Sequence, residues 1–233
     1  MAISLPTIRW QNQGMATRVT LIRHAESNNM VSREIGGSKA DTGLTDEGKR
    51  QVALLGNRLA HSGWHPAAVF TSPLPRAVET AATIADVLQV EAHRHDGLGY
   101  RWPPAADGLS WDEYRREFGL PGGGVFRPYE TGIEPWAEFV ARFGRTLYDI
   151  LYEYAGQCVV LITHEEMIDA TLRTLGDPPL RGLFDVRVTP TSITEWSTTD
   201  DLGRGGPPDW ALPRWRLERF NDAGHLEPRR PNE

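Results

Sequence analysis

Short β-branched and apolar runs recur along the chain and are separated by longer amphipathic segments, and this alternation limits the fold more than any other feature. The clearest run is CVVLIT at Cys158–Thr163, which predicts a buried central strand. Similar runs predict strands at residues 18–22, 67–71 and 90–95, and residues 214–220 are strand-like again. Strands that are separated by helices usually pair in parallel.

The segments between these strands carry apolar residues at helical spacing. Thr45 is a predicted cap for a helix at 46–60, Ser72 with Pro73 starts a second predicted helix, and a third covers about 135–154. We therefore predict an α/β fold: a three-layer sandwich with a mostly parallel central sheet. In such folds, ligands bind at the carboxyl ends of the strands.

The length of the chain suits one α/β domain with a single substantial core, which we expect over residues 18–233. Residues 97–133 are rich in Gly, Pro and aromatic side chains, and a segment of this length predicts a lid-like insertion that forms a wall of the site. We expect residues 1–17 to be a loose N-terminal extension. Within it, residues 1–14 are either a native tail or the product of an upstream start, because Met15 also precedes the first strand.

Charge and cysteine content exclude several functions. The formal net charge is −6 and no Lys- or Arg-rich run is present, so we expect no nucleic-acid partner. The single cysteine, Cys158, excludes an intramolecular disulfide and a cysteine-rich zinc site. The sequence has no apolar stretch of membrane-spanning length and does not open like a signal peptide, so we expect a cytoplasmic protein without membrane contact.

Basic residues follow three of the predicted strands. Arg23 and His24 come directly after the first strand, Arg76 lies in the first turn of the helix after the second, and His164 follows Cys158–Thr163. If these strands are neighbours in a parallel sheet, the four side chains meet at one edge and form a pocket suited to phosphate. The dipeptide Arg94-His95 repeats the Arg-His pattern, and we expect it to be an ordinary strand end.

Four ordered motifs resemble the histidine phosphatase superfamily, in its phosphoglycerate mutase-like branch. They are LIRHAES, LTDEGKRQ, TSPLPRAVETA and VVLITHEE, beginning at residues 21, 44, 71 and 159. The resemblance implies that His24 is the nucleophile that becomes phosphorylated. It also implies that Arg23, Arg76 and His164 hold the phosphoryl group, with no metal and no cofactor.

The sequence departs from this family pattern in three ways. Ala25 replaces a glycine, and Met30 replaces an asparagine that often contacts phosphate. The usual glutamate general acid is also absent, because Leu98-Gly99-Tyr100 stands in its place. We favour Glu165 as the proton donor, by analogy with the acid phosphatase branch of the superfamily, and keep Asp96 and Asp107 as alternatives.

These observations favour a phosphomonoesterase that acts on a small phosphorylated metabolite, such as a sugar or nucleoside-like phosphate. Only 88 positions separate Arg76 from His164, and the ending NDAGHL resembles that of the family's small phosphatases. Phosphoglycerate mutase activity and phospho-ligand binding without efficient catalysis remain the alternatives. The predicted substrate contacts are Ser27, Asn28, Asn29 and Arg33. The predicted strand at 214–220 is compatible with a homodimer.

Overall fold

In the computed structural model, all described strands join one six-stranded sheet with the order β3-β2-β4-β1-β5-β6. The structure describes residues 16–101, 104–118, 125–126, 133–176, 186–199, 202 and 213–227. The strands are β1 (Thr17–Arg23), β2 (Ala68–Thr71), β3 (Ala92–Arg94), β4 (Cys158–Thr163), β5 (Ile193–Thr198) and β6 (Arg216–Asp222). β1, β2, β3 and β4 run parallel to one another, β5 runs antiparallel to β1, and β6 runs antiparallel to β5. This confirms the predicted, mostly parallel sheet.

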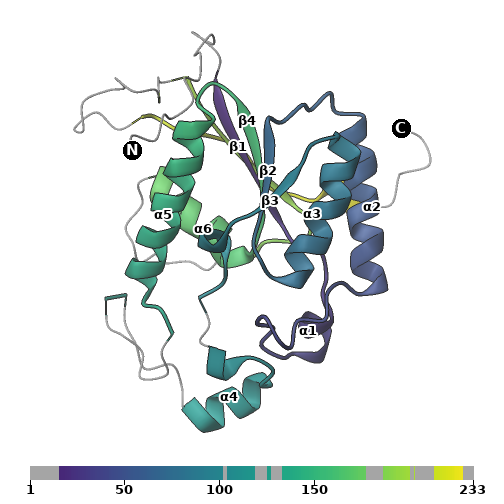
Figure 1. Cartoon of the computed structure of the whole chain (residues 1–233), viewed down its shortest axis with the longest axis vertical. Helices are drawn as coiled ribbons and strands as arrows, with labels where there is room; N and C mark the ends of the chain where they lie inside the picture. Colours follow the sequence, from purple (N-terminus) through teal and green to yellow (C-terminus); the bar gives the residue numbers. More distant parts are fainter. Residues whose placement is uncertain are drawn as a thin grey trace, which may run out of the picture.

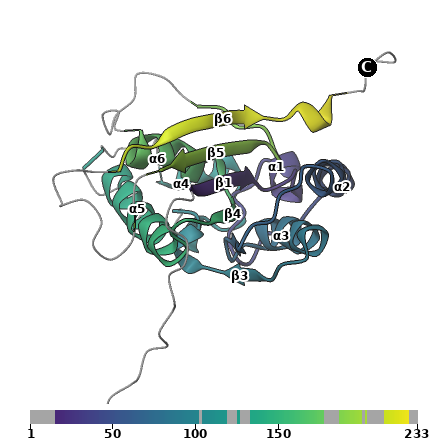
Figure 2. The same ribbon diagram turned by 90° about the horizontal axis from the view of Figure 1, so that it is seen from above.

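Helices cover both faces of the sheet, which confirms the three-layer arrangement (Figure 2). One layer contains α2 (Asp46–Ala60) and α3 (Pro75–Leu88), and the other contains α5 (Trp136–Glu153) and α6 (Glu165–Leu175). Two shorter helices, α1 (Asn28–Ser32) and α4 (Trp111–Phe118), lie together at one end of the molecule, at the bottom of Figure 1. The 3-10 helices are η1 (Asp96–Leu98), η2 (Pro104–Ala106) and η3 (Gly224–Leu226).

Alternating residues of β4 fill the two cores on either side of the sheet. Val159 and Leu161 pack with α5 and α6, whereas Val160 and Ile162 pack with α2 and α3. All four side chains are fully buried, and each burial contributes about 1.5–3 kcal/mol. A one-residue slip of β4 would exchange the two sets of residues, so packing fixes its register. That register sets Thr163, which precedes His164, beside Arg23.

The motif that begins at Leu44 attaches α2 to the segment after His24. Thr45 caps α2 as predicted, because its hydroxyl accepts a hydrogen bond from Gly48 N at 2.9 Å. Thr45 Oγ1 also donates to Glu26 Oε1 at 2.7 Å. Gly48 is required by close approach, since a Cβ at this position would lie 2.0 Å from the Glu26 carbonyl oxygen. The first turn of α2 therefore supports the backbone that carries His24.

The predicted start of the second helix is wrong. The α3 helix begins at Pro75 with Leu74 as its N-cap, two residues later than the predicted Ser72-Pro73 start. Pro75 takes the first helical position, which suits a residue without an N–H group. Ser72 is therefore not the N-cap of α3, and its hydroxyl lies 2.8 Å from His164 Nε2.

Three other boundaries differ from the sequence expectations. β1 begins at Thr17, so the last residue of the expected N-terminal extension, residues 1–17, belongs to the first strand. Residues 1–15 lie outside the described part of the chain. β3 is shorter than the predicted 90–95, and β6 extends to Asp222 rather than ending at 220. Parts of the insertion at 97–133 also lie outside the description, but α4 and a small buried cluster around Tyr114 belong to it. No helix in the described ranges combines the length and apolar character needed to cross a membrane.

Candidate active site

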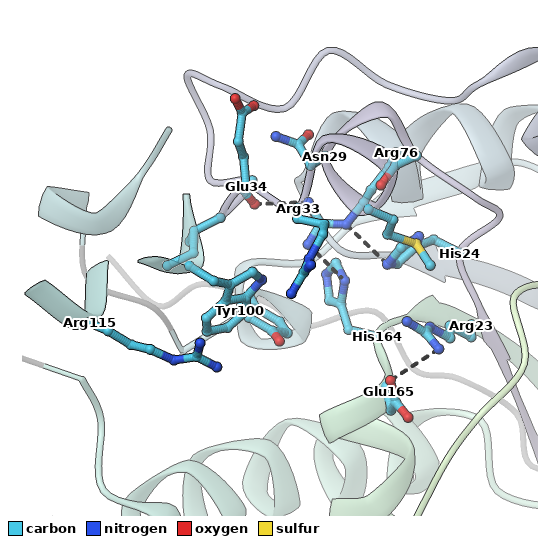
Figure 3. A pocket seen from close by; sticks show the side chains of 15 residues that line it. Arg23, His24, Asn29, Arg33, Glu34, Arg76, Tyr100, Arg115, His164 and Glu165 are labelled. Atoms are coloured by element: carbon cyan, nitrogen blue, oxygen red, sulfur yellow. Dashed lines mark hydrogen bonds and ion pairs between the residues drawn. The ribbon is translucent and has the colours of Figure 1, made fainter. Parts of the chain in front are cut away.

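The three basic features predicted at strand ends converge on one pocket (Figure 3). β2, β4 and β1 are adjacent and parallel, so their carboxyl ends face the same side. Arg23 and His24 come from the end of β1, Arg76 from the first turn of α3, and His164 from the N-cap of α6. The cavity has a volume of about 560 Å³. In the described ranges, no group of three or more His, Cys, Asp and Glu side chains is placed to hold a metal ion.

The contacts of His24 define which ring nitrogen is available. Nδ1 lies 2.7 Å from the carbonyl oxygen of Ala25, so it carries the proton and donates. Nε2 accepts a hydrogen bond from Arg76 Nε at 3.0 Å and is therefore the unprotonated nitrogen of the neutral ring. Burial and the nearby charges of Arg76 and Arg23 hold the pKa of His24 well below its usual value. His24 is a neutral imidazole whose Nε2 faces a cationic group.

Arg76 connects the two histidines to a buried carboxylate. Its Nη1 donates to Asp41 Oδ2 at 2.7 Å and to the carbonyl oxygen of Gly36 at 2.9 Å. Its Nη2 lies 3.3 Å from His164 Nδ1. The Asp41 side chain is fully buried and the Arg76 side chain is 8% exposed. Removing either partner of such a pair leaves an uncompensated buried charge, so Asp41 both fixes and neutralises Arg76.

His164 is held from both sides of its ring. Its Nε2 contacts Ser72 Oγ at 2.8 Å, and its ring lies edge-on to those of His24 and Tyr100, with centroid separations of 5.1 and 5.2 Å. Burial is the main reason that the pKa of His164 is well below its usual value, and the charge on Arg76 lowers it further. Because the Arg76 guanidinium can only donate, Nδ1 of His164 accepts, and Nε2 is the protonated nitrogen that donates to Ser72 Oγ.

Arg23 is fixed by α6 and by the segment before β5. Its Nη1 lies 3.0 Å from Glu165 Oε2 and also donates to the carbonyl oxygen of Val188. The other carboxylate oxygen of Glu165 accepts a hydrogen bond from Val188 N at 3.0 Å. These contacts tie Arg23, Glu165 and Val188 into one unit at the edge of the pocket.

The three candidate proton donors occupy different surroundings. Glu165 lines the pocket, whereas Asp96 and Asp107 do not. Asp107 accepts hydrogen bonds from the backbone N–H groups of residues 37, 39 and 40, which makes it the anchor of that loop. Tyr100 also lines the pocket, and burial is the largest of the effects that raise the pKa of its hydroxyl.

Three of the four predicted substrate contacts line the pocket, namely Ser27, Asn29 and Arg33. Asn28 is the exception, because its side-chain amide donates to the backbone and hydroxyl oxygens of Thr42 outside the cavity. Ser27 Oγ and Asn29 Oδ1 are buried and have no hydrogen-bond partner among the described residues. Buried polar atoms normally find a partner, so both are available to a ligand.

Several residues of the site were missed by sequence reasoning. No pattern marks Asp41 as the buried partner of Arg76, and Ser72 was taken for a helix cap. Arg115 lies in the predicted insertion, where its position in a lid-like segment was the only signal. The expectation for Arg94-His95 agrees with the structure: Arg94 ends the edge strand β3, His95 follows it, and neither lines the pocket.

The fold and the pocket together define an α/β protein with a pocket lined by arginines and histidines at the carboxyl edge of its parallel strands. The chain belongs to the histidine phosphatase superfamily, branch 1, whose family model matches residues 19–204. This confirms the family that the four ordered motifs predict.

Individual relatives cover different shares of the chain. It is 31% identical over 190 residues to the bifunctional protein Rv2228c of Mycobacterium tuberculosis, covering 78% of this chain and 50% of that protein. The chain thus spans about half the length of this relative. It is 26% identical over 212 residues to the uncharacterized phosphatase PhoE of Bacillus subtilis, covering 90% and 97% of the two chains.

The fold is also similar to a solved structure, Bacillus stearothermophilus YhfR. The TM-score is 0.75 at 22% identity, and the match covers 91% of this chain and 100% of the other. The two proteins share the arrangement of sheet and helices.

Proposed function

We propose that this chain is a metal-independent phosphomonoesterase that hydrolyses a small phosphorylated metabolite through a phosphohistidine on His24. The observation that carries the proposal is the state of His24: a buried neutral ring with its Nε2 lone pair directed at Arg76. A neutral imidazole is a nucleophile for phosphorus, and covalent catalysis divides one difficult displacement into two easier ones. Arginines supply the positive charge that the transferring phosphoryl group requires.

In the first step, His24 Nε2 attacks phosphorus as the bond from phosphorus to the ester oxygen breaks. The leaving alkoxide takes a proton from the general acid, and a phosphorus–nitrogen bond forms. Arg76 exchanges its hydrogen bond to Nε2 for one to a phosphoryl oxygen. In the second step, water attacks phosphorus and loses a proton to the same carboxylate while the phosphorus–nitrogen bond breaks, which releases orthophosphate. His24 returns to its neutral form.

Glu165 is our proposed proton donor. Its position at the pocket edge supports this role, since neither Asp96 nor Asp107 lines the cavity. Its side chain is 34% exposed, which leaves a path for proton exchange with solvent. Arg23 Nη1 lies 3.0 Å from Glu165 Oε2, so in this proposal substrate binding draws Arg23 toward the phosphoryl group and leaves this oxygen to face the leaving group.

The outer part of the pocket favours a substrate with a second anionic group. Figure 3 shows Arg33 and Arg115 directing their guanidinium groups into the cavity from the side opposite Glu165, while the Glu34 carboxylate points away. Two arginines beyond the phosphoryl site can bind a carboxylate or a second phosphate. Tyr100 and Trp111 add apolar wall area that suits a ring, as in a sugar or nucleoside-like phosphate.

The similarity to PhoE supports hydrolysis rather than mutase chemistry. That relative is named a phosphatase, and the match spans 97% of its length. A mutase must keep the phosphohistidine from water until a second substrate hydroxyl arrives. The two activities share the first step, so the fate of the phosphoryl group separates them.

The test is a screen of phosphomonoesters for orthophosphate release, with and without EDTA, using His24→Ala as the inactive variant. The exposed His61→Ala is the matched control and should keep full activity. Quenching without acid should trap phosphate on His24. Phosphate exchange between phosphoglycerates without net release would establish a mutase instead. Binding of phosphorylated ligands without any covalent adduct would overturn both enzymatic assignments.

A further inference from the structure

The C-terminal turn NDAGHL contacts a segment that the catalytic proposal has not yet used. Asn221 Oδ1 accepts a hydrogen bond from Thr189 N at 2.7 Å, and His225 Nε2 lies 2.9 Å from Thr191 Oγ1. Neither Asn221 nor His225 lines the pocket. The turn is itself fixed to α2, since both carboxylate oxygens of Asp222 accept hydrogen bonds from Arg58.

The segment 188–191 reaches the pocket on its other side. The carbonyl oxygen of Val188 accepts a hydrogen bond from the Arg23 guanidinium, and the N–H of Val188 donates a hydrogen bond to the Glu165 carboxylate. Thr191 N donates to the backbone carbonyl oxygen of Arg23 at 3.0 Å. The segment therefore holds both the backbone and the side chain of Arg23, and the carboxylate of Glu165 as well.

Two residues of this connection have a positive φ, which their neighbours must hold in place. Thr191 has φ of 60° and Asn221 has φ of 52°. Positive φ is rare and unfavourable for a β-branched residue, so the surrounding contacts must maintain it. Thr191 is fully buried. Its hydroxyl contacts His225, and its N–H donates a hydrogen bond to the Arg23 carbonyl oxygen.

We infer that the C-terminal turn, through Asn221 and His225, positions Arg23 and Glu165 for phosphoryl transfer by holding the segment 188–191 against the pocket. Asn221 and His225 are positioning residues, since they touch neither the proposed nucleophile nor the pocket. The inference rests on the proposed function in one respect: it takes Arg23 as a ligand of the phosphoryl group. A catalytic group displaced by about 1 Å can lose up to about 10²-fold in rate, so loss of this anchor should be measurable.

The test compares two substitutions at Asn221. Asn221→Gly tolerates the positive φ but removes the acceptor for Thr189 N, whereas Asn221→Asp keeps an acceptor oxygen. We expect Asn221→Gly to lower kcat/KM for 4-nitrophenyl phosphate about tenfold and Asn221→Asp to stay within about threefold of wild type. Gln89→Gly, at another positive-φ position on the exposed end of α3, is the control and should change nothing. Equal loss in Asn221→Gly and Asn221→Asp would overturn the inference.

A double-mutant cycle with Arg23 separates positioning from general stability. In an Arg23→Ala background, Asn221→Gly should reduce kcat/KM for 4-nitrophenyl phosphate less than about twofold, because Arg23 is gone and this substrate needs little protonation from Glu165. Additive losses, or a lower Tm with unchanged kinetics, would show a purely structural role. If Asn221→Gly does not fold, His225→Ala is used for the same cycle.

Orthophosphate binding distinguishes failure of this inference from failure of the proposed function. If the wild-type chain binds orthophosphate but hydrolyses no ester, the phosphatase proposal fails, and the cycle is measured on phosphate affinity instead. An unchanged phosphate affinity in Asn221→Gly would then overturn the positioning role.

Discussion

Arg76 Nε donates a hydrogen bond to His24 Nε2 at 3.0 Å, which places a fixed cation at the atom proposed to attack phosphorus. Arg76 is itself held by Asp41, so the guanidinium is oriented before any substrate arrives. The same contact identifies Nε2 as the unprotonated nitrogen of His24. Preorganised charge of this kind needs little rearrangement during the reaction.

Replacing Arg76 by lysine should lower kcat/KM about 10²–10³-fold, because one ammonium cannot reproduce the planar donors that reach His24, Asp41 and His164. The measurement is steady-state hydrolysis of 4-nitrophenyl phosphate. Arg94→Lys, at the exposed strand end that repeats the Arg-His dipeptide, should leave kcat/KM unchanged. Activity within threefold of wild type in Arg76→Lys would remove Arg76 from the mechanism.

The ring of His24 should stay neutral as the pH falls through 6.5, the usual pKa of a histidine, since burial and two arginines lower its pKa. Long-range ¹H–¹⁵N spectra of the free protein should show a protonated Nδ1 and an unprotonated Nε2 on both sides of this pH. Titration of both nitrogens near pH 6.5 would contradict the buried neutral ring.

The same pKa shift has a consequence for stability. His24 is neutral in the folded state, whereas in the unfolded chain it binds a proton below about pH 6.5. The unfolded state then holds more protons, so the free energy of unfolding should fall as the pH drops below 6.5, with a slope of up to about 1.4 kcal/mol per pH unit from this group. Denaturation of His24→Gln should show a shallower pH dependence between 6.5 and the folded-state pKa of His24.

Asp41→Ala should destabilise the protein by about 3–5 kcal/mol, because it leaves the buried Arg76 charge without a counter-ion. Urea denaturation gives this difference directly. The control is Asp46→Ala, which removes an exposed carboxylate from the start of α2 and should cost less than about 1 kcal/mol. Similar losses in both variants would mean that Asp41 does not neutralise Arg76.

The convergence of His24, Arg76 and His164 could be predicted because strand order and register follow from packing. β1 and β4 are apolar on both faces, which marks them as central, and parallel neighbours deliver their carboxyl ends to one edge. β5 was not predicted, since its residues 193–198 are mostly polar. They are nevertheless buried, because Glu195 pairs with Arg18 and Arg219 from the adjoining strands.

Side-chain partners across loops were much harder to predict. The sequence separation of 35 between Asp41 and Arg76 carries no periodic signal, and the contact exists only because the loop before α2 folds over the start of α3. Near Ser72, two local sequence signals compete: Pro73 and Pro75 both suit the first position of a helix, and the helix begins at Pro75. Local propensity could not reveal that Ser72 contacts His164.

Glu165→Gln should slow hydrolysis of an alkyl phosphate about 10²–10⁴-fold if Glu165 supplies the proton to the leaving group. A 4-nitrophenolate leaving group needs little protonation, so 4-nitrophenyl phosphate should be affected much less. The ratio of the two losses matters, because Glu165 also contacts Arg23 and a positioning defect would slow both substrates equally. Equal losses, or none, would exclude Glu165 as the acid and shift attention to the phenol of Tyr100.

Arg33→Asn and Arg115→Ala should raise KM for substrates that carry a second anionic group and leave 4-nitrophenyl phosphate unaffected. Each lost charge-assisted contact is worth about 1.5–3 kcal/mol, or roughly 10–150-fold in KM when binding is at equilibrium. Asparagine suits position 33 because the residue has φ of 59°. Arg116→Ala is the matched control, since Arg116 neighbours Arg115 on α4 but does not line the pocket. Equal effects on singly and doubly anionic esters would place both arginines at the phosphoryl group and leave the second anion without a site.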